Sequence, residues 1–273
     1  MNKPILIIGK PNSSKTTFIA QLYMRLLTKK SSLTLYKAVE NISAIKEACD
    51  LLANGEGTKT TPVNKNVGLL LPIQFGKQKV DLFCPDYGGE QINNIINNRG
   101  IDKKWSDSIN GSDNWILFIR LSNLKTSFDL SNKTINPIIL KINSGQEQEY
   151  AISDQTAFIE LLQIMLHVKG HDHHFKNYKT KLTVVLTCWD ELETKDLPGE
   201  KLVQHLPLLL NFIESNWEMD KINIVGLSAL GFSLTQKENS EKYKIEGSEN
   251  FGYLIKSDGT KIKDITELIS VAL

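Results

Sequence analysis

The most constraining feature of this 273-residue chain is an apolar run near its start that leads through a polar turn into a helical pattern. Residues 5–8 are all aliphatic, as in a buried strand. After the turn, apolar side chains recur at the three- and four-residue spacing of a helix face, at Phe18, Ile19, Leu22 and Leu26. The pattern therefore predicts a strand, a short loop and a helix in immediate succession.

The loop between them has the spacing of a phosphate-binding P-loop, G-x-x-x-x-G-K-[ST], with Gly9 first and Lys15-Thr16 last. In such a loop the backbone N–H groups face an anion, the lysine reaches the outer phosphates and the hydroxyl holds Mg²⁺. Ser14 stands where the motif has its second glycine, although glycine adopts unusual loop conformations more easily. The predicted nucleotide-binding residues of this segment are Gly9, Asn12, Ser13, Ser14, Lys15, Thr16 and Thr17. An ordinary strand-to-helix turn that contains a lysine is the alternative interpretation.

Composition limits the class of protein and of partner. The length fits one large α/β domain or two small ones, and 41% hydrophobic with 23% charged residues is ordinary for a globular protein. A formal charge of +1 gives no reason to propose nucleic acid or an anionic membrane as the main partner. No apolar run approaches the roughly 18 residues of a membrane span. Cys49, Cys84 and Cys188 lie far apart and suit free thiols, so we expect a cytoplasmic protein without an export signal.

Strand-like and helix-like segments alternate along the rest of the chain. The predicted strands are 33–36, 67–75, 79–84, 115–119, 182–186 and 222–225, and a hairpin follows at 253–255 with a turn at 258–259. The predicted helices are 44–52, one from about 91, one at 154–167 capped by Ser153, one at 200–217 interrupted by Pro207, and one from 265. Alternation of this kind predicts an α/β fold with a mostly parallel sheet and helices on both faces. We expect one domain over 1–273, with insertions near 31–56 and 122–150 and a C-terminal hairpin–helix extension near 240–273.

Four polar segments follow predicted strands directly. In an open parallel sheet, ligands bind beyond the carboxyl ends of the strands, so these segments are expected to share one edge. They are Gly9–Thr17, Asp86–Glu90, Thr187–Asp190 and Ser228–Leu230.

These segments, in this order, resemble the motifs of small GTPases of the translation-factor-like class, which are P-loop proteins with a Ras-like G domain. Asp86-Tyr87-Gly88-Gly89 is similar to D-x-x-G, whose aspartate supports Mg²⁺ through water and whose glycine senses the γ-phosphate. Thr187-Cys188-Trp189-Asp190 resembles the N/T-K-x-D element, whose aspartate accepts from two donors that guanine has and adenine lacks. Ser228-Ala229-Leu230 is similar to the S-A-K loop that brackets the base. The resemblance implies GTP or GDP with Mg²⁺ as cofactors and assigns Gly89, Thr187, Asp190, Ser228, Ala229 and Leu230 to the nucleotide.

The resemblance also implies metal-binding and catalytic residues. Thr16, Thr61 and Asp86 are the expected metal residues, and Thr60 is an alternative to Thr61 as the switch threonine. Glu90 stands where many relatives have the glutamine that positions the attacking water. A carboxylate there is repelled by the γ-phosphate, so slow hydrolysis is expected, with Gln91 as a substitute. The expected catalytic residues are thus Glu90, Gln91 and Thr61.

Three further features bear on the chemistry. Gly9-x-Pro11-Asn12 is similar to the loop of bacterial GTPases that use K⁺ in place of an arginine finger, although an asparagine also suits an ordinary turn. Cys188 replaces a lysine whose stem covers the base, which favours weaker guanine binding. His171–His174 has the composition of a metal site, but we expect a solvated loop because no other motif supplies further ligands.

Within the class, the segment before the switch, the Thr-Cys-Trp-Asp variant and the C-terminal hairpin resemble bacterial double-GTPase proteins of conflict (anti-phage) systems. That resemblance implies a protein partner, a second GTPase-like module. The expected function is a GTP-binding switch with slow Mg²⁺-dependent hydrolysis. Two alternatives stay open: a nucleotide-binding interaction module without turnover, and an ATPase or phosphotransferase on the same loop, against which Asp190 argues.

Overall fold

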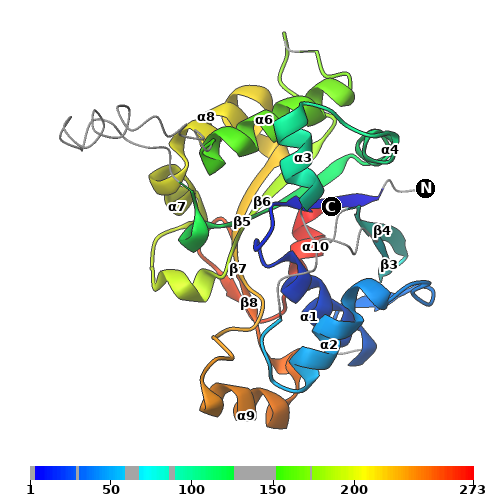
Figure 1. Cartoon of the computed structure of the whole chain (residues 1–273), viewed down its shortest axis with the longest axis vertical. Helices are drawn as coiled ribbons and strands as arrows, with labels where there is room; N and C mark the ends of the chain where they lie inside the picture. Colours follow the sequence, from blue (N-terminus) through cyan, green and yellow to red (C-terminus); the bar gives the residue numbers. More distant parts are fainter. Residues whose placement is uncertain (1–3, 29–30, 59–67, 86–89, 126–151, 173) are drawn as a thin grey trace, which may run out of the picture.

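The computed structural model describes residues 4–28, 31–58, 68–85, 90–125, 152–172 and 174–273. Within these residues one sheet of nine strands has the order β2-β3-β4-β1-β5-β6-β7-β8-β9 (Figure 1). The strands are β1 (Ile5–Gly9), β2 (Leu33–Leu35), β3 (Leu69–Phe75), β4 (Gln78–Cys84), β5 (Asn114–Arg120), β6 (Lys181–Thr187), β7 (Ile222–Ser228), β8 (Tyr253–Ile255) and β9 (Lys261–Ile262).

The central strands β4, β1, β5, β6 and β7 are parallel neighbours. The outer pairs β2–β3, β3–β4, β7–β8 and β8–β9 are antiparallel. Only β3 and β8 therefore run against the common direction, and the mostly parallel α/β sheet predicted from the sequence is confirmed. β1 is buried along its whole length, as expected for a strand covered on both faces.

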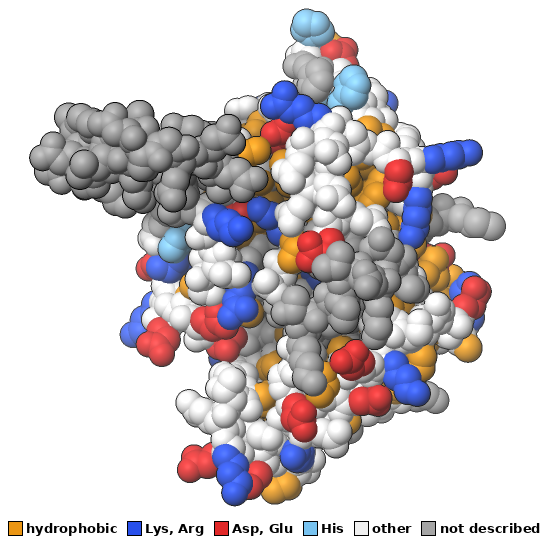
Figure 2. Space-filling model, in the orientation of Figure 1, with side chains coloured by type: hydrophobic (Ala, Val, Ile, Leu, Met, Phe, Trp, Pro, Cys, Tyr) orange, Lys and Arg blue, Asp and Glu red, His pale blue; other side chains and the backbone are white. Residues whose placement is uncertain are grey.

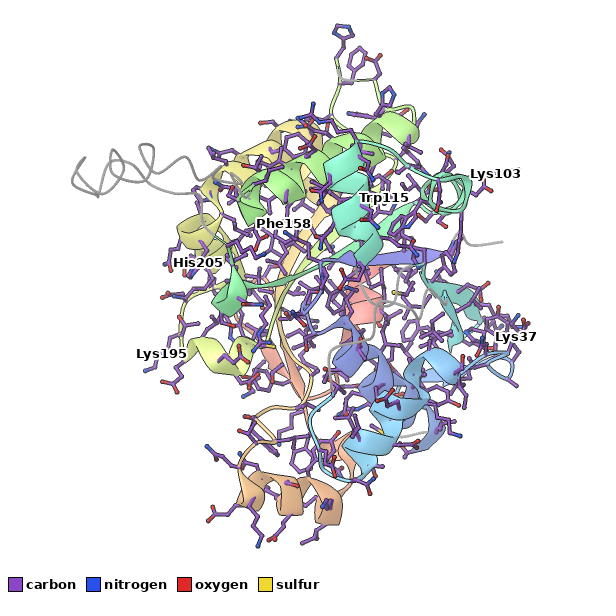
Figure 3. All side chains as sticks on the ribbon, in the orientation of Figure 1. Lys37, Lys103, Trp115, Phe158, Lys195 and His205 are labelled. Atoms are coloured by element: carbon purple, nitrogen blue, oxygen red, sulfur yellow. The ribbon has the colours of Figure 1, made fainter. Side chains whose placement is uncertain are left out.

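Helices cover both faces of the sheet (Figure 1). One hydrophobic core lies between the sheet and α1 (Lys15–Thr28), α2 (Ser43–Ala53) and α10 (Glu267–Ala272). The other lies under α3 (Glu90–Asn98), α4 (Lys103–Gly111), α6 (Asp154–Val168), α7 (Pro198–His205) and α8 (Pro207–Asn216). Trp115 and Phe158 belong to this second core, and Figure 3 shows them on this side of the sheet. α9 (Lys237–Glu246) lies apart from the sheet at the lower end of Figure 1.

Local sequence signals explain several element boundaries. Ser153 caps α6, since its hydroxyl accepts a hydrogen bond from the Thr156 N–H at 3.2 Å, as predicted. The predicted interruption at Pro207 is confirmed, because α7 ends at His205 and α8 begins at Pro207.

Two of the α-helices in the described part of the chain were not predicted. α4 buries only Trp105 and Ile109, a stripe too short to show a helical period, although Asp102 caps it by accepting from the Trp105 N–H at 2.8 Å. α9 buries Tyr243 alone and is otherwise polar, so its sequence has no apolar face to detect.

The surface gives little indication of a partner from charge alone. Acidic and basic side chains are interspersed over the face shown in Figure 2, in keeping with the formal charge of +1. Among the described residues, none of the helices combines the length and the apolar character that crossing a bilayer requires.

Candidate functional site

The P-loop lies at the carboxyl end of β1, between β4 and β5 in the middle of the sheet. Gly9 is required there by packing, because a Cβ atom on it would lie 2.8 Å from the Phe118 carbonyl oxygen of β5. The loop then runs through residues 10–14, and α1 begins at Lys15. The predicted strand, loop and helix are thus present in the predicted order.

Lys15 folds back into the loop. It is only 3% exposed, and its Nζ donates hydrogen bonds to the carbonyl oxygens of Gly9 at 2.5 Å and Lys10 at 3.0 Å. A third contact joins Nζ to the Ser13 Oγ at 3.3 Å, and Ser13 is itself buried. A buried ammonium group needs such partners, and this one is held inside a loop at a helix N-terminus. The arrangement fits the binding of a phosphate anion.

Two loop residues have a left-handed backbone, Asn12 with a φ of 61° and Ser14 with a φ of 63°. Asparagine tolerates this conformation, whereas serine adopts it at a cost. The serine at the motif's second glycine position therefore has the backbone conformation for which glycine is suited. Residues of positive φ therefore alternate with a residue of negative φ, Ser13, along this part of the loop. Such alternation turns successive N–H groups toward one concave side, which is the geometry of anion-binding nests.

The outer side of the loop is fixed to α6. Lys10 pairs with the buried carboxylate of Asp154, the first residue of that helix. The second carboxylate oxygen of Asp154 accepts from the Lys125 N–H at 2.8 Å. A cavity of about 530 Å³ lies between this side of the loop, α3 and α6, and its lining includes Asn93, Asn97 and Arg120. Amide and cationic groups therefore line the space beside the P-loop.

The segment after β6 lies at the same edge of the sheet. The Thr187 hydroxyl is buried and donates to the Ile119 carbonyl oxygen at 3.2 Å, which ties β6 to β5. Trp189 is 5% exposed and lies against Gly226, where a Cβ atom would come within 2.5 Å of its ring. Trp189 is thus a packing residue beneath the segment. Asp190 follows it and is half-buried.

The two positions at which the sequence departs from the motifs are in contact. The Ser14 side chain lies beside the Cys188 thiol, and Cys188 has a left-handed backbone with a φ of 52°. Burial raises the pKa of this thiol to about 11, against the opposing effects of the nearby Arg120 guanidinium and of the Ser14 side chain. Ser14 and Cys188 therefore mark where the P-loop approaches the segment that carries Asp190.

The segment after β7 completes this edge. Ser228 and Ala229 are buried and Leu230 is half-buried. The Ser228 hydroxyl oxygen accepts from the Gly231 N–H at 2.8 Å, which shapes the turn. In the segment after β6, the Glu191 carboxylate accepts two hydrogen bonds from Arg120, one from Nη2 at 2.5 Å and one from Nε at 3.1 Å. The structure thus brings together three of the four predicted segments as ordered turns.

The remaining predicted residues are only partly described. Thr61, Thr60, Asp86 and Gly89 lie outside the described residues. Glu90 is the first residue of α3, and the Gln91 side-chain oxygen accepts from the Trp105 indole N–H at 2.6 Å. Among the residues described, no group of three or more His, Cys, Asp or Glu side chains is placed to hold a metal ion. Thr16, in the first turn of α1, is the described residue with a hydroxyl at the predicted Mg²⁺ position.

Sequence reasoning missed one residue at this edge, Thr58. Its hydroxyl lies 2.6 Å from the hydroxyl of Thr17 in α1. Thr58 belongs to the stretch 56–62, which is polar and has no apolar periodicity, so no spacing rule could have singled it out. The contact joins the start of the segment with the predicted switch threonine to the P-loop helix.

Comparison with solved structures gives low similarity to GTP-binding proteins. An Arl6 BBS3 small GTPase from Trypanosoma brucei with a bound nucleotide analogue is 12% identical, with a TM-score of 0.39, covering 91% of this chain and 98% of that one. The S. cerevisiae Ski7 GTPase-like domain bound to GTP is 18% identical, with a TM-score of 0.40, and the alignment covers 84% of this chain and 43% of that chain. Methanosarcina barkeri Roco2 RocCORdC bound to GDP is 12% identical, with a TM-score of 0.31 and coverages of 90% and 47%.

No curated protein sequence matches the chain significantly. The family profile described as Double-GTPase 1, in contrast, matches residues 6–272, which is nearly the whole sequence. The chain therefore belongs to the Double-GTPase 1 family of P-loop GTPases.

Proposed function

We propose that this protein is a GTP-binding switch that hydrolyses GTP slowly and acts through a protein partner. The observation that carries the proposal is the burial of Lys15 inside a P-loop at the same sheet edge as Asp190 and Ser228–Leu230. The lysine and the loop N–H groups are suited to phosphates, and the Asp190 carboxylate is suited to the two donors of guanine.

Mg²⁺ belongs to the proposal. Thr16 would hold the ion together with Thr61 and Asp86, and the ion would offset charge on the phosphate oxygens. We also infer a K⁺ site at Asn12, whose left-handed backbone is equally consistent with turn chemistry alone.

The proposed partner is a second GTPase-like module in a bacterial conflict system. The family description, Double-GTPase 1, supports this proposal. The competing function, a nucleotide-binding module without turnover, is favoured by the position of Gln91, whose side-chain oxygen already accepts from Trp105.

The test is nucleotide binding by calorimetry with Mg²⁺ present. Lys15→Ala is expected to weaken GTP binding at least tenfold, because one cationic donor to the phosphates is lost. Lys169→Ala is the matched control. Lys169 also donates to backbone carbonyl oxygens, those of Ile109 at 3.1 Å and Ser112 at 2.5 Å, but it lies at the opposite edge of the sheet.

The same titrations test which base the protein prefers. Asp190→Asn is expected to move the preference from GTP toward xanthosine triphosphate, because an amide can donate to the second carbonyl of xanthine. Wild-type protein that binds ATP as tightly as GTP would contradict guanine recognition and favour the ATPase alternative. Wild-type protein that binds neither nucleotide would contradict the whole proposal.

A further inference from the structure

The aromatic residue Tyr253 lies beside the proposed base-recognition segments. It is the first residue of β8 and stands opposite Ser228 in the antiparallel β7–β8 pair. Residues directly opposite each other in such a pair have side chains on the same face of the sheet. Tyr253 is half-buried and packs against the core cluster that contains Trp189. Its ring therefore lies at the carboxyl end of β7, on the side of the sheet that carries the Trp189–Asp190 segment.

Asp190 is also close to Tyr253. Burial raises the pKa of the Tyr253 hydroxyl, and the negative charge of the Asp190 carboxylate raises it further. The phenol is consequently neutral at physiological pH and keeps its proton. Asp190 and Tyr253 thus lie at the same edge of the sheet, Asp190 after β6 and Tyr253 at the start of β8.

One side chain of β9 is positioned over the ring. The Lys261 Nζ lies 3.7 Å from the centroid of the Tyr253 ring, which is a close cation–π contact. Lys261 stands opposite Ile255, two residues along β8 from Tyr253, so the register places it on the same face. No ion pair between Lys261 and an acidic side chain is present within the described residues, and its ammonium group faces the Tyr253 ring. Lys261 thereby restricts the orientation of the tyrosine ring.

The neighbouring side chains are already committed to other contacts. Trp189 is held beneath its segment against Gly226, and the Cys188 thiol lies beside the Ser14 side chain. Phe232, farther along the segment after β7, packs edge-on against Phe251 at a centroid separation of 5.0 Å. Of these described aromatic side chains, Tyr253 is the one that lies opposite Ser228 and is only half-buried.

We propose that Tyr253 is a specificity-determining residue on whose ring the guanine base stacks, and that Lys261 is the positioning residue that holds the ring. The inference rests on the proposed function, since it places the base beside Asp190. Aromatic rings stack on the π-face of a base, and removing such a ring weakens binding roughly 5- to 150-fold. The phosphates, held by the P-loop, should be unaffected by the substitution.

The experiment distinguishes recognition of the base from recognition of the phosphates. Dissociation constants for GTP and for inorganic tripolyphosphate, both with Mg²⁺, are measured by competition for wild type, Tyr253→Ala, Tyr253→Phe and Lys261→Gln. Tyr253→Ala is expected to weaken GTP binding about tenfold and to leave tripolyphosphate unchanged. Tyr253→Phe should bind GTP like wild type, because it keeps the ring. Lys261→Gln should give an intermediate loss.

Tyr178→Ala is the matched control. Tyr178 also has a lysine over its ring, with the Lys179 Nζ at 5.6 Å from the centroid, but it precedes β6 at the opposite edge of the sheet. Wild-type affinity of Tyr253→Ala for GTP, or an equal loss for GTP and tripolyphosphate, would overturn the inference. Failure of wild type itself to bind GTP would instead identify the proposed function as the error, and the inference would fall with it.

A spectroscopic measurement gives a second readout. The protein contains seven tyrosines, and labelling with 3-fluorotyrosine gives each a fluorine resonance. Loss of one resonance in Tyr253→Phe assigns the signal of Tyr253. That signal is expected to move on addition of GTP and to stay in place on addition of tripolyphosphate, while the Tyr178 signal stays unchanged with both. A Tyr253 signal that is insensitive to GTP in protein that binds it would overturn the inference.

Discussion

At the residue scale, the site concentrates left-handed backbone at non-glycine residues. Asn12 and Ser14 lie in the P-loop, and Cys188 lies in the segment before Asp190. Such residues persist where their surroundings hold them in place, and they are common at ligand sites. Here the Ser14–Cys188 contact is one of those surroundings, since it joins two of the strained residues to each other.

Ser14→Gly is expected to raise the free energy of unfolding by about 0.5–1 kcal/mol. Removing the left-handed penalty of a β-carbon gains about 1–2 kcal/mol, and the greater freedom of glycine in the unfolded chain offsets part of that gain. Urea denaturation measures the difference. Asn12→Gly serves as the control and should gain less, because asparagine already tolerates this backbone. A loss of stability in Ser14→Gly would mean that the contact with Cys188 outweighs the strain.

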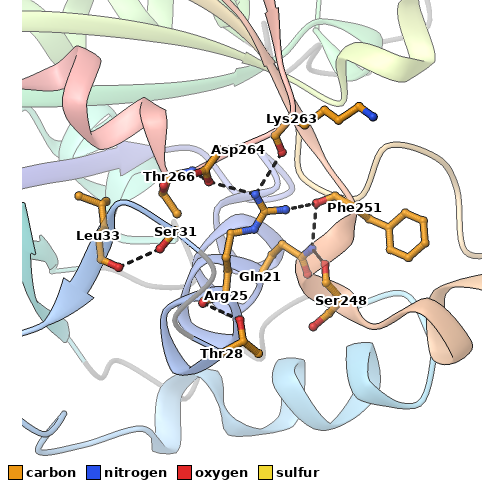
Figure 4. Close-up of polar contacts among 10 residues, drawn as sticks. All are labelled: Gln21, Arg25, Thr28, Ser31, Leu33, Ser248, Phe251, Lys263, Asp264 and Thr266. Carbon is orange, nitrogen blue, oxygen red and sulfur yellow. Dashed lines mark hydrogen bonds and ion pairs between the residues drawn. The ribbon is translucent and has the colours of Figure 1, made fainter.

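At the element scale, a buried polar network ties α1 to the C-terminal part of the chain (Figure 4). Gln21 is fully buried; its amide nitrogen donates to the carbonyl oxygens of Ser248 and Phe251, and its amide oxygen accepts from the Tyr243 hydroxyl at 2.5 Å. Arg25 donates to the Phe251 carbonyl oxygen at 2.8 Å and to the Asp264 carboxylate at 3.0 Å. Since α1 also carries Lys15 and Thr16, the network fixes the helix that presents the phosphate-binding residues.

Gln21→Leu is expected to lower the free energy of unfolding by about 1–3 kcal/mol. Leucine is similar in size, but it leaves the buried Tyr243 hydroxyl without its acceptor, and an unsatisfied buried group costs about 1–3 kcal/mol. The Ser248 and Phe251 carbonyl oxygens each lose one donor but keep the Phe251 N–H and the Arg25 guanidinium as partners. Urea denaturation again gives the value. Tyr243→Phe removes one bond of the same network and should cost about 1 kcal/mol, while Leu27→Gln, at a 56% exposed position of the same helix, should change little. Equal stability of Gln21→Leu and wild type would show that this network does not hold α1.

At the scale of the whole molecule, local patterns were enough to predict the sheet, the P-loop and the edge at which the candidate site lies. Strand periodicity, the Ser153 cap and the Pro207 interruption are signals contained within a few residues. The long-range contacts could not be predicted in this way. The Tyr243–Gln21 bond spans 222 positions, and the Ser14–Cys188 contact joins two residues that each look like an isolated departure from a motif. Such pairings are fixed by packing of the complete fold, and a single sequence does not display them.

The arrangement of the proposed site has different consequences for the binding of GTP and for its hydrolysis. The P-loop and the segments after β6 and β7 surround the proposed nucleotide site with ordered turns, whereas the cavity of about 530 Å³ beside the P-loop is bordered by α3, which begins at Glu90. A carboxylate at that position opposes the charge of a γ-phosphate, and the Gln91 side-chain oxygen is engaged by Trp105. The chain on its own is therefore expected to bind GTP and to hydrolyse it slowly.

Glu90→Gln is accordingly expected to raise the single-turnover hydrolysis rate about tenfold at unchanged GTP affinity, because a neutral amide can position water without repelling the phosphate. Phosphate release is measured in equal concentrations of KCl and NaCl. An advantage of KCl that disappears in Asn12→Ala would support the proposed K⁺ site, whereas equal rates in both salts would leave Asn12 as turn chemistry. A slower Glu90→Gln enzyme would contradict the repulsion argument and indicate that Glu90 acts as the general base, since only a carboxylate can take the proton of the attacking water.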